Sequence, residues 1–216
     1  MNNFQYVTER QLSSARSNLI QIISSVHNLV RQDFTFQSRF VGSVERNMVT
    51  QDVKSNVGFD FDVDLRVNDD GCRYSAKEIK TKIMLALNQV ACRYGYDNAE
   101  DSTRVITIKV KDRQNSKILH SCDFAIVNDY TDDAGNERQE YIHFNKKQKS
   151  YSWQEQPQGF YLLEEKADWI KDCGCWQEVM DLYLDKKNRN NNPYKHSRSI
   201  YAETIHEVCQ KHGYFG

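Results

Sequence analysis

A strictly alternating segment near residue 60 constrains this chain more than any other feature. Residues 57–67 read Val-Gly-Phe-Asp-Phe-Asp-Val-Asp-Leu-Arg-Val. Successive side chains of a β-strand point to opposite faces, so the apolar residues share one face and the charged residues share the other. The charged residues are Asp60, Asp62, Asp64 and Arg66. The segment therefore predicts a strand that covers a hydrophobic core and presents a row of carboxylates on its far side.

The rest of the chain changes between helical and strand periodicity. Apolar residues at three- and four-residue steps predict a helix over 8–33, with Thr8 as its N-cap and Glu9 in its first turn. Further strands are expected over 34–41, 104–111, 117–127 and 137–145, and further helices over 75–94, 158–171, 175–187 and 197–212. Residues 44–56 lack a clear period and are expected to form a loop.

This order of elements predicts an α+β fold. A mixed β-sheet flanked by helices is followed by a C-terminal helical segment. We expect residues 1–150 to form a core, and residues 151–216 to form a helical region that packs on it.

Charge and hydropathy exclude some functions. A formal net charge of −1 argues against a protein that mainly coats nucleic acid. No apolar run approaches the roughly 20 residues that span a bilayer, and the first residues lack the pattern of a secretory signal. We therefore expect a cytoplasmic protein without a membrane partner. In that setting the six cysteines are expected to be free thiols.

The carboxylates of the alternating strand suggest a cation site. Neighbouring acids on one face of a strand lie about 7 Å apart, and their like charges repel. Mg²⁺ prefers carboxylate oxygens and keeps water ligands that substrate phosphates can replace. The alternative is a solvated strand face whose acids meet only water.

Two other segments strengthen the cation hypothesis. Asp123 interrupts an apolar run, Ser-Cys-Asp-Phe-Ala-Ile-Val over 121–127, where an unpaired charge would be costly. Gly42 and Ser43 follow a predicted strand, and such a turn can offer backbone N–H groups and a hydroxyl to a phosphate. Each feature alone is also compatible with an ordinary strand or turn.

Taken in order, Gly42-Ser43, Asp62-Val63-Asp64 and Asp123 resemble the DNA polymerase β-type nucleotidyltransferase superfamily. The resemblance covers about residues 8–130. It implies that Asp62 and Asp64 hold triphosphate-bound Mg²⁺ or Mn²⁺, and that Asp123 joins them at a second ion and acts catalytically. It also implies that Gly42 and Ser43 bind the terminal phosphates. Asp60 is either a neighbour that supports these ligands or a ligand itself, if the register is shifted.

A fainter resemblance follows the third acid. Residues 149–153, Lys-Ser-Tyr-Ser-Trp, look like the corresponding region of oligoadenylate-synthetase and cyclic-dinucleotide-synthase enzymes. That resemblance implies that a lysine and a serine reach phosphates and that an aromatic ring stacks on the base. The candidate nucleotide-binding residues are Lys147, Lys149, Tyr151, Ser152 and Trp153. Core packing is the alternative role of the two aromatic residues.

The resulting functional hypothesis is an enzyme. It would move a nucleoside monophosphate from ATP or another nucleoside triphosphate to a hydroxyl acceptor and release pyrophosphate. The product could be a nucleotide second messenger or an oligonucleotide, and the acceptor a nucleotide, an RNA end, a small molecule or a protein. The alternative is a catalytically silent nucleotide-binding module of the same fold.

Two cysteine and histidine groups were also considered as metal sites. Cys173 and Cys175 lack a second cysteine pair at standard spacing. His206, Cys209 and His212 match no standard ligand pattern. Helix-surface residues are the simpler interpretation of the second group, and metal binding stays open for both groups.

Overall fold

A computed structural model describes residues 2–69 and 73–214. The chain divides into two compact units. The core unit comprises Val7–Val49 and Ser55–Gln156, and the helical unit comprises the residues up to Tyr6, Thr50–Lys54 and the residues from Pro157 onward. The division falls after residue 156, and not after 150 as the sequence suggested, because residues 151–155 belong to a strand of the core sheet.

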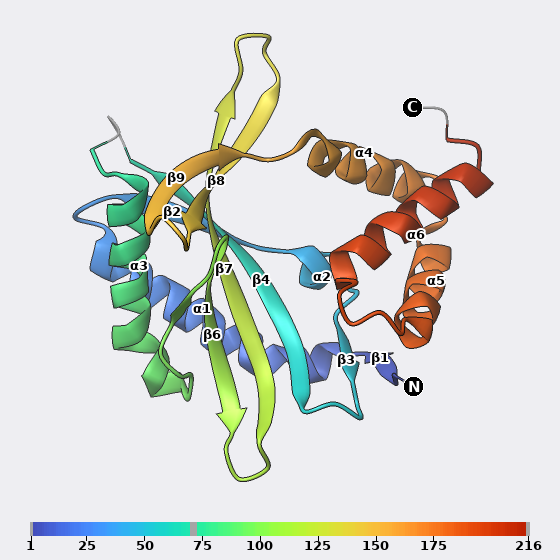
Figure 1. Cartoon of the computed structure of the whole chain (residues 1–216), viewed down its shortest axis with the longest axis horizontal. Helices are drawn as coiled ribbons and strands as arrows, with labels where there is room; N and C mark the ends of the chain where they lie inside the picture. Colours follow the sequence, from blue (N-terminus) through green and yellow to red (C-terminus); the bar gives the residue numbers. More distant parts are fainter. Residues whose placement is uncertain (1, 70–72, 215–216) are drawn as a thin grey trace. The chain divides into compact units, whose positions relative to one another are not determined.

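The core unit contains a seven-stranded mixed sheet, which confirms the predicted α+β fold class. Its strands are β2 (Thr35–Val41), β4 (Val57–Asn68), β5 (Glu100–Asp101), β6 (Val105–Asp112), β7 (Lys117–Thr131), β8 (Glu137–Asn145) and β9 (Ser150–Glu155). The main path runs β2-β4-β7-β6-β5, and the β8–β9 hairpin pairs with the second half of β7. Figure 1 shows β4 and β7 side by side in the sheet.

The pairing of β4 with its two neighbours positions the acidic residues. β4 runs antiparallel to β2 and parallel to β7. In this register Val41, Asp62 and Asp123 lie directly beside one another on three adjacent strands. Side chains at paired positions point to the same face of a sheet. The two carboxylates therefore project together.

Two helices cover the other face of the sheet. They are α1 (Glu9–Val30) and α3 (Ala76–Val90), and α3 continues into the 3-10 turn η1 (Ala91–Tyr94). Thr8 and Gln11 form a capping box at the start of α1, as Ser75 and Glu78 do at the start of α3. These reciprocal bonds satisfy backbone groups that the first helical turn leaves without partners. The predicted N-cap at Thr8 is confirmed.

The hydrophobic core lies between these helices and the apolar face of the sheet. Phe59, Phe61, Val63 and Leu65 of β4 are all buried, as the alternation predicted, but Val57 at the start of the strand is exposed. Gly58, just before Phe59, lets β4 approach β7 closely: a Cβ at that position would lie 1.8 Å from the backbone oxygen of Leu119. Only glycine allows this separation of the two backbones.

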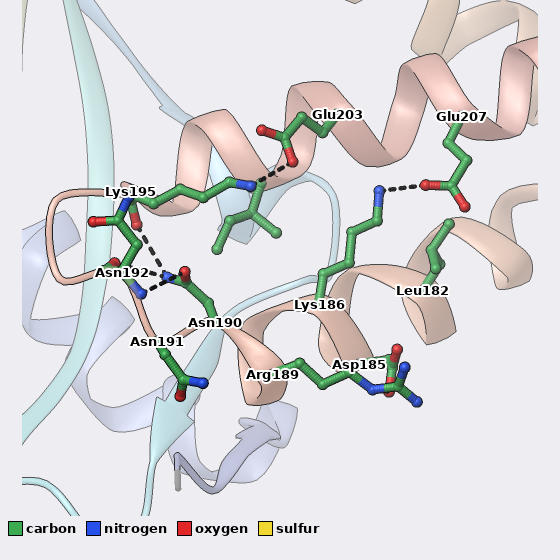
Figure 2. A pocket seen from close by; sticks show the side chains of 11 residues that line it. Leu182, Asp185, Lys186, Arg189, Asn190, Asn191, Asn192, Lys195, Glu203 and Glu207 are labelled. Carbon is green, nitrogen blue, oxygen red and sulfur yellow. Dashed lines mark hydrogen bonds and ion pairs between the residues drawn. The ribbon is translucent and has the colours of Figure 1, made fainter.

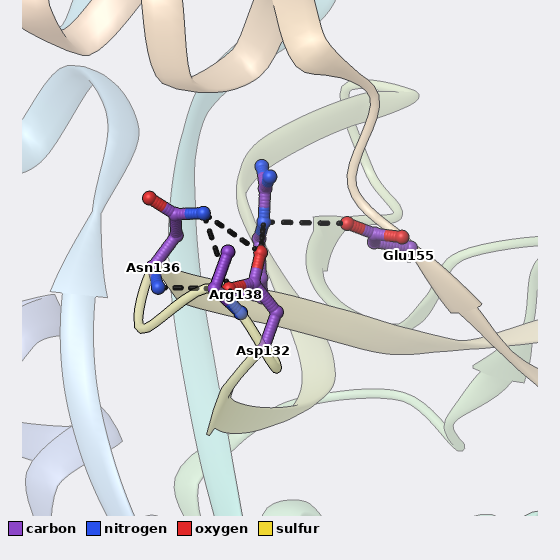
Figure 3. A network of polar contacts seen from close by, with 5 residues as sticks. Asp132, Asn136, Arg138 and Glu155 are labelled. Carbon is purple, nitrogen blue, oxygen red and sulfur yellow. Dashed lines mark hydrogen bonds and ion pairs between the residues drawn. The ribbon is translucent and has the colours of Figure 1, made fainter.

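A polar network closes the β7–β8 hairpin (Figure 3). Asp132 accepts hydrogen bonds from the backbone and side chain of Asn136 and forms an ion pair with Arg138 at 2.9 Å. These bonds, with those from Asn136 the largest, hold the pKa of Asp132 well below its usual range. Arg138 of β8 also lies 3.8 Å from Glu155 of β9, so the turn residue Asp132 meets charges on two strands at this end of the hairpin.

The helical unit combines a small sheet with three helices. Its elements are β1 (Phe4–Tyr6), β3 (Thr50–Asp52), α4 (Gln158–Asp172), α5 (Trp176–Arg189) and α6 (Ser197–Lys211). Lys187 of α5 donates to Thr50 Oγ1 of β3 at 2.7 Å and lies 4.1 Å from the ring centroid of Phe4 of β1. The helix α5 therefore contacts both short strands through this one side chain. The predicted loop over 44–56 is therefore wrong at β3. A three-residue polar strand has too few residues to show a period.

A groove of about 600 Å³ lies in the helical unit, between α5, α6 and the segment that joins them (Figure 2). Its cations are paired with its anions. Lys186 lies 2.6 Å from Glu207, and Lys195 lies 2.6 Å from Glu203. Because these charges satisfy one another, the groove offers no cluster of like charges for a ligand of opposite charge.

Two further predictions concern membranes and cysteines. Within the described residues, no helix is long and apolar enough to cross a membrane. The five described cysteines are free thiols, as predicted: Cys92, Cys122, Cys173, Cys175 and Cys209. Cys72 lies outside the described residues.

Candidate active site

Asp62 and Asp123 form the centre of the candidate site. They occupy paired positions on the parallel strands β4 and β7, on the face of the sheet that α1 and α3 do not cover. Burial, and then the charges of Asp123 and Asp60, raise the pKa of Asp62 to about 6. Burial likewise raises the pKa of Asp123. The fold therefore concentrates negative charge here at a cost in stability.

Hydroxyl groups from neighbouring strands partly compensate this charge. Thr107 of β6 donates to Asp123 Oδ1 at 2.5 Å, and this bond opposes the rise in the pKa of Asp123. Ser121 of β7 donates to the carboxylate of Asp60. A hydroxyl supplies one hydrogen bond but no charge, so it leaves the repulsion between the acids in place.

Gly42 lies directly against Asp62. It is the first residue of the short helix α2 (Gly42–Glu45), which follows β2, and its φ of +68° is in the left-handed region. A Cβ at Gly42 would lie 2.5 Å from Asp62 Oδ2 and 3.2 Å from its Cγ. The site thus needs glycine for its backbone conformation and for the space that the carboxylate occupies.

Ser43 and Arg46 complete this side of the site. Ser43 follows Gly42 in α2, and its carbonyl accepts a hydrogen bond from the Met48 N–H at 2.8 Å. The Arg46 N–H bonds back to the Gly42 carbonyl at 3.3 Å. The positive charge of Arg46 lowers the pKa of Asp62, opposing the neighbouring acids. The predicted glycine–serine turn therefore lies beside the acids with a cation that sequence reasoning missed.

Asp64 projects from the same face as Asp62, one step further along β4. It is paired with Arg39 of β2 and with Ala125 of β7, and its charge contributes to the raised pKa of Asp62. Asp60, at the other side, is exposed and bonded to Ser121. Because Gly42 and Asp123 both meet Asp62, the geometry favours the register with Asp62 and Asp64 over the one centred on Asp60.

These residues fit a hard divalent cation by their chemistry. Three carboxylates share one face of two paired strands, and burial followed by the charges of Asp123 and Asp60 raises the pKa of Asp62, so a bound cation would offset an unfavourable charge. Their side chains do not converge on a single point in this structure: no three His, Cys, Asp or Glu groups in residues 2–69 and 73–214 are arranged to hold a metal ion. Asp123 instead bonds to Thr107, on the side away from β4.

The two predicted aromatic residues lie elsewhere. Tyr151 and Trp153 of β9 are paired with Phe144 and Ile142 of β8, and both pack against the hydrophobic core. The Tyr151 ring stacks on Phe144 at 4.5 Å, and its hydroxyl donates to Asp101 at 2.6 Å. These contacts on the helix-covered face favour the packing role over base stacking.

The other predicted nucleotide contacts lie on the β8–β9 hairpin. Lys147 and Lys149 are exposed in its turn, and Ser152 is exposed on β9, on the face opposite Tyr151. The structure thus brings together Asp62, Asp64, Asp123, Gly42 and Ser43. It leaves the roles of Lys147, Lys149 and Ser152 as predictions.

Sequence reasoning also missed two residues on β6. Thr107 is paired with Asp123, and Lys109 is paired with Ser121. The positive charge of Lys109 lowers the pKa of Asp123, and its Nζ forms an ion pair with Glu100 at 2.5 Å. The alternation of 105–109 indicates which face these residues share, but not that the face belongs to the acid site.

Comparisons with known proteins were decisive for the fold alone. No family profile and no curated protein matches the sequence. The STING-associated c-di-GMP synthase CdnE from Capnocytophaga granulosa aligns with 98% of this chain at 15% identity and a TM-score of 0.59. The Vibrio cholerae cyclic AMP-GMP synthase DncV aligns with 93% at 11% identity and a TM-score of 0.59. CdnG from Bradyrhizobium diazoefficiens, solved with GTP, aligns with 82% at 13% identity and a TM-score of 0.50.

The chain has the fold of these nucleotidyltransferases. This is the fold that the resemblance to the nucleotidyltransferase superfamily implied. The chain spans 64% of the solved CdnE chain, 67% of DncV and 46% of CdnG. The likeness therefore places the acid-bearing sheet in a known architecture, over part of those proteins' lengths.

Proposed function

We propose that this chain is a metal-dependent nucleotidyltransferase that moves a nucleoside monophosphate from a nucleoside triphosphate to a hydroxyl group, with release of pyrophosphate. The proposal rests on the geometry around Asp62. Asp62 and Asp123 occupy paired positions on adjacent strands, and the absence of a side chain at Gly42 leaves room for the Asp62 carboxylate. Such a site concentrates carboxylates beside a turn, which is the arrangement that a metal-bound polyphosphate requires.

Each residue of the site has a separate role in the proposed reaction. Asp62 and Asp64 would hold Mg²⁺ or Mn²⁺ together with Asp123. When bound, the ion neutralises phosphate charge and stabilises the entering and leaving oxygens. Gly42 and Ser43 would contact the terminal phosphates. Arg46 adds positive charge on the same side, as its effect on the pKa of Asp62 indicates.

Asp123 is suited to accept the proton of the attacking hydroxyl. Burial raises its pKa, and a base works best when its pKa is not far below the working pH. Thr107 donates to Oδ1 of Asp123, which leaves the second oxygen for the acceptor's proton. The remaining rate gain would come from holding the acceptor and the α-phosphate in line.

Joining nucleotides to each other is the form of this chemistry that the neighbours' fold favours. Two of the structural neighbours are cyclic-dinucleotide synthases, and a third was solved with GTP. We therefore propose a nucleotide as the acceptor for this chain. A protein, an RNA end or another small molecule would be an alternative acceptor at the same site.

A product assay tests this function directly. The purified protein would be incubated with all four ribonucleoside triphosphates and Mg²⁺ or Mn²⁺. We expect pyrophosphate release and a linked nucleotide product identified by mass spectrometry. A triphosphate that raises the melting temperature without pyrophosphate release would instead indicate the silent binding module. Neither effect, with any triphosphate or metal, would refute a nucleotide site.

A further inference from the structure

The helical unit brings together a thiol, an imidazole and a carboxylate from three places in the sequence. Cys175 directly precedes α5, Glu178 lies in the first turn of α5, and His212 directly follows α6. The Cys175 Sγ lies 3.8 Å from His212 Nδ1, and His212 Nε2 lies 2.9 Å from Glu178 Oε2. All three belong to one compact unit.

The carboxylate determines how the imidazole is oriented. Hydrogen bonds from Lys211, at 2.7 Å, and from His212 hold the pKa of Glu178 below its usual range. An ionised carboxylate only accepts hydrogen bonds, so Nε2 of a neutral His212 must carry the proton. The lone pair of Nδ1 then faces the Cys175 thiol. This is the order of a nucleophile, a base and a group that orients the base.

A helix terminus and a lysine lie beside the sulfur. Cys175 is the N-cap of a 14-residue helix, and the first backbone N–H groups of a helix attract negative charge. The positive charge of Lys211 is electrostatically coupled to Cys175 as well. The side chains of His212 and Glu178 are 33% and 31% exposed, and Cys175 is half-buried. A small reagent can therefore reach the thiol.

We propose that Cys175 is a nucleophilic thiol and a site of reversible oxidation by peroxides, with His212 as its base and Glu178 as the residue that positions His212. The thiol proton passes to His212 Nδ1, and the sulfur attacks one oxygen of hydrogen peroxide. The O–O bond breaks, and the departing hydroxide takes the proton from His212 and leaves as water. The product is the Cys175 sulfenic acid, which thiol reductants restore.

A metal site at the same place is the competing explanation. Cys173 and Cys209 lie near enough to interact electrostatically, so four possible ligands occupy one region. In the described part of the chain, however, no three such side chains are arranged to hold a metal ion. The contacts of His212, with Glu178 on one nitrogen and Cys175 on the other, fit a thiol–base pair, and the Cys173 carbonyl oxygen is a second acceptor 3.5 Å from the sulfur.

Competitive labelling tests the proposal on the whole chain. The native protein would be treated with limiting hydrogen peroxide, the sulfenic acid captured with dimedone, and each cysteine followed by peptide mass spectrometry. Cys92, exposed on η1 in the other unit, is the internal control. Because His212 lies where it can accept the thiol proton during the attack, we expect Cys175 to react about tenfold faster than Cys92, or more. Iodoacetamide should give the same order.

Variants distinguish a loss of thiol reactivity from a loss of folding. His212→Gln removes the base and should lower the Cys175 rate to that of Cys92, while Glu178→Gln should lower it less. The Cys92 rate and the melting temperature of each variant show whether the fold is intact. A Cys175 rate no higher than that of Cys92 in the native protein would overturn the proposal. So would zinc that co-purifies with the protein and shields Cys175 until a chelator removes it.

Discussion

The Asp62→Asn variant should lose nucleotide transfer and gain stability. Asparagine keeps the shape of the side chain but removes the charge that holds a divalent cation, so we expect transfer to fall by about a thousandfold or more. Pyrophosphate release with Mg²⁺ and the best triphosphate measures this loss.

The gain in stability follows from the pKa of Asp62, which is about 6 in the folded protein against an ordinary value of 3.8. Between these two values the folded state binds more protons than the unfolded state, so stability falls as the pH rises from about 4 to about 6. The whole shift corresponds to roughly 3 kcal/mol at neutral pH. In metal-free buffer at pH 7, Asp62→Asn should recover about 1–3 kcal/mol in urea unfolding.

Asp97→Asn provides the matched control. Asp97 lies in the core unit too, but it is paired with Lys111 at 2.8 Å and Arg113 at 2.7 Å, and these bonds lower its pKa. Removing this charge should reduce stability at pH 7 and leave transfer unchanged. The opposite signs test whether burial and repulsion of the Asp62 charge, and not a general effect of amidation, underlie the result. An unchanged rate of nucleotide transfer in Asp62→Asn would show that Asp62 does not hold the metal ion needed for the reaction.

The acidic strand β4 shows which structural features can be predicted from residues that are close together in the sequence. The alternation predicted that the apolar side chains from Phe59 to Leu65 are buried and that the acids share the opposite face, because strand geometry depends only on neighbouring residues. Val57, at the end of the strand, is exposed instead. The pairing of Asp62 with Asp123 is different, since it depends on parallel contact between segments about 60 residues apart. Only the order of motifs in a known superfamily could connect them before the fold was seen.

Other parts of the site could not be predicted for related reasons. Thr107 bonds to Asp123 because β6 lies beside β7, and nothing in the residues around 107 indicates that neighbour. Tyr151 and Trp153 alternate with serines, so their pattern indicates a strand face but not which face of the sheet. Cys175 and His212 are 37 positions apart, and two helix ends bring them together.

Gly42→Ala should separate backbone strain from damage to the site. The φ of +68° costs an L-residue about 1–2 kcal/mol. The new Cβ would also lie 2.5 Å from Asp62 Oδ2, so the carboxylate must move. A displacement of about 1 Å in a reacting site can cost roughly a hundredfold in rate. We therefore expect a modest loss of stability together with a loss of transfer of about a hundredfold.

Gly95→Ala is the control because it places alanine at a positive φ without bringing the new Cβ close to another atom. Gly95 has a φ of +82°, and a Cβ there would meet nothing within 4 Å. Both variants should therefore lose similar stability in urea unfolding, while only Gly42→Ala loses transfer. Equal losses of transfer would mean that global destabilisation explains the effect. Unchanged transfer in Gly42→Ala would mean that the carboxylate of Asp62 does not depend on the space beside Gly42, and the glycine would then serve the turn alone.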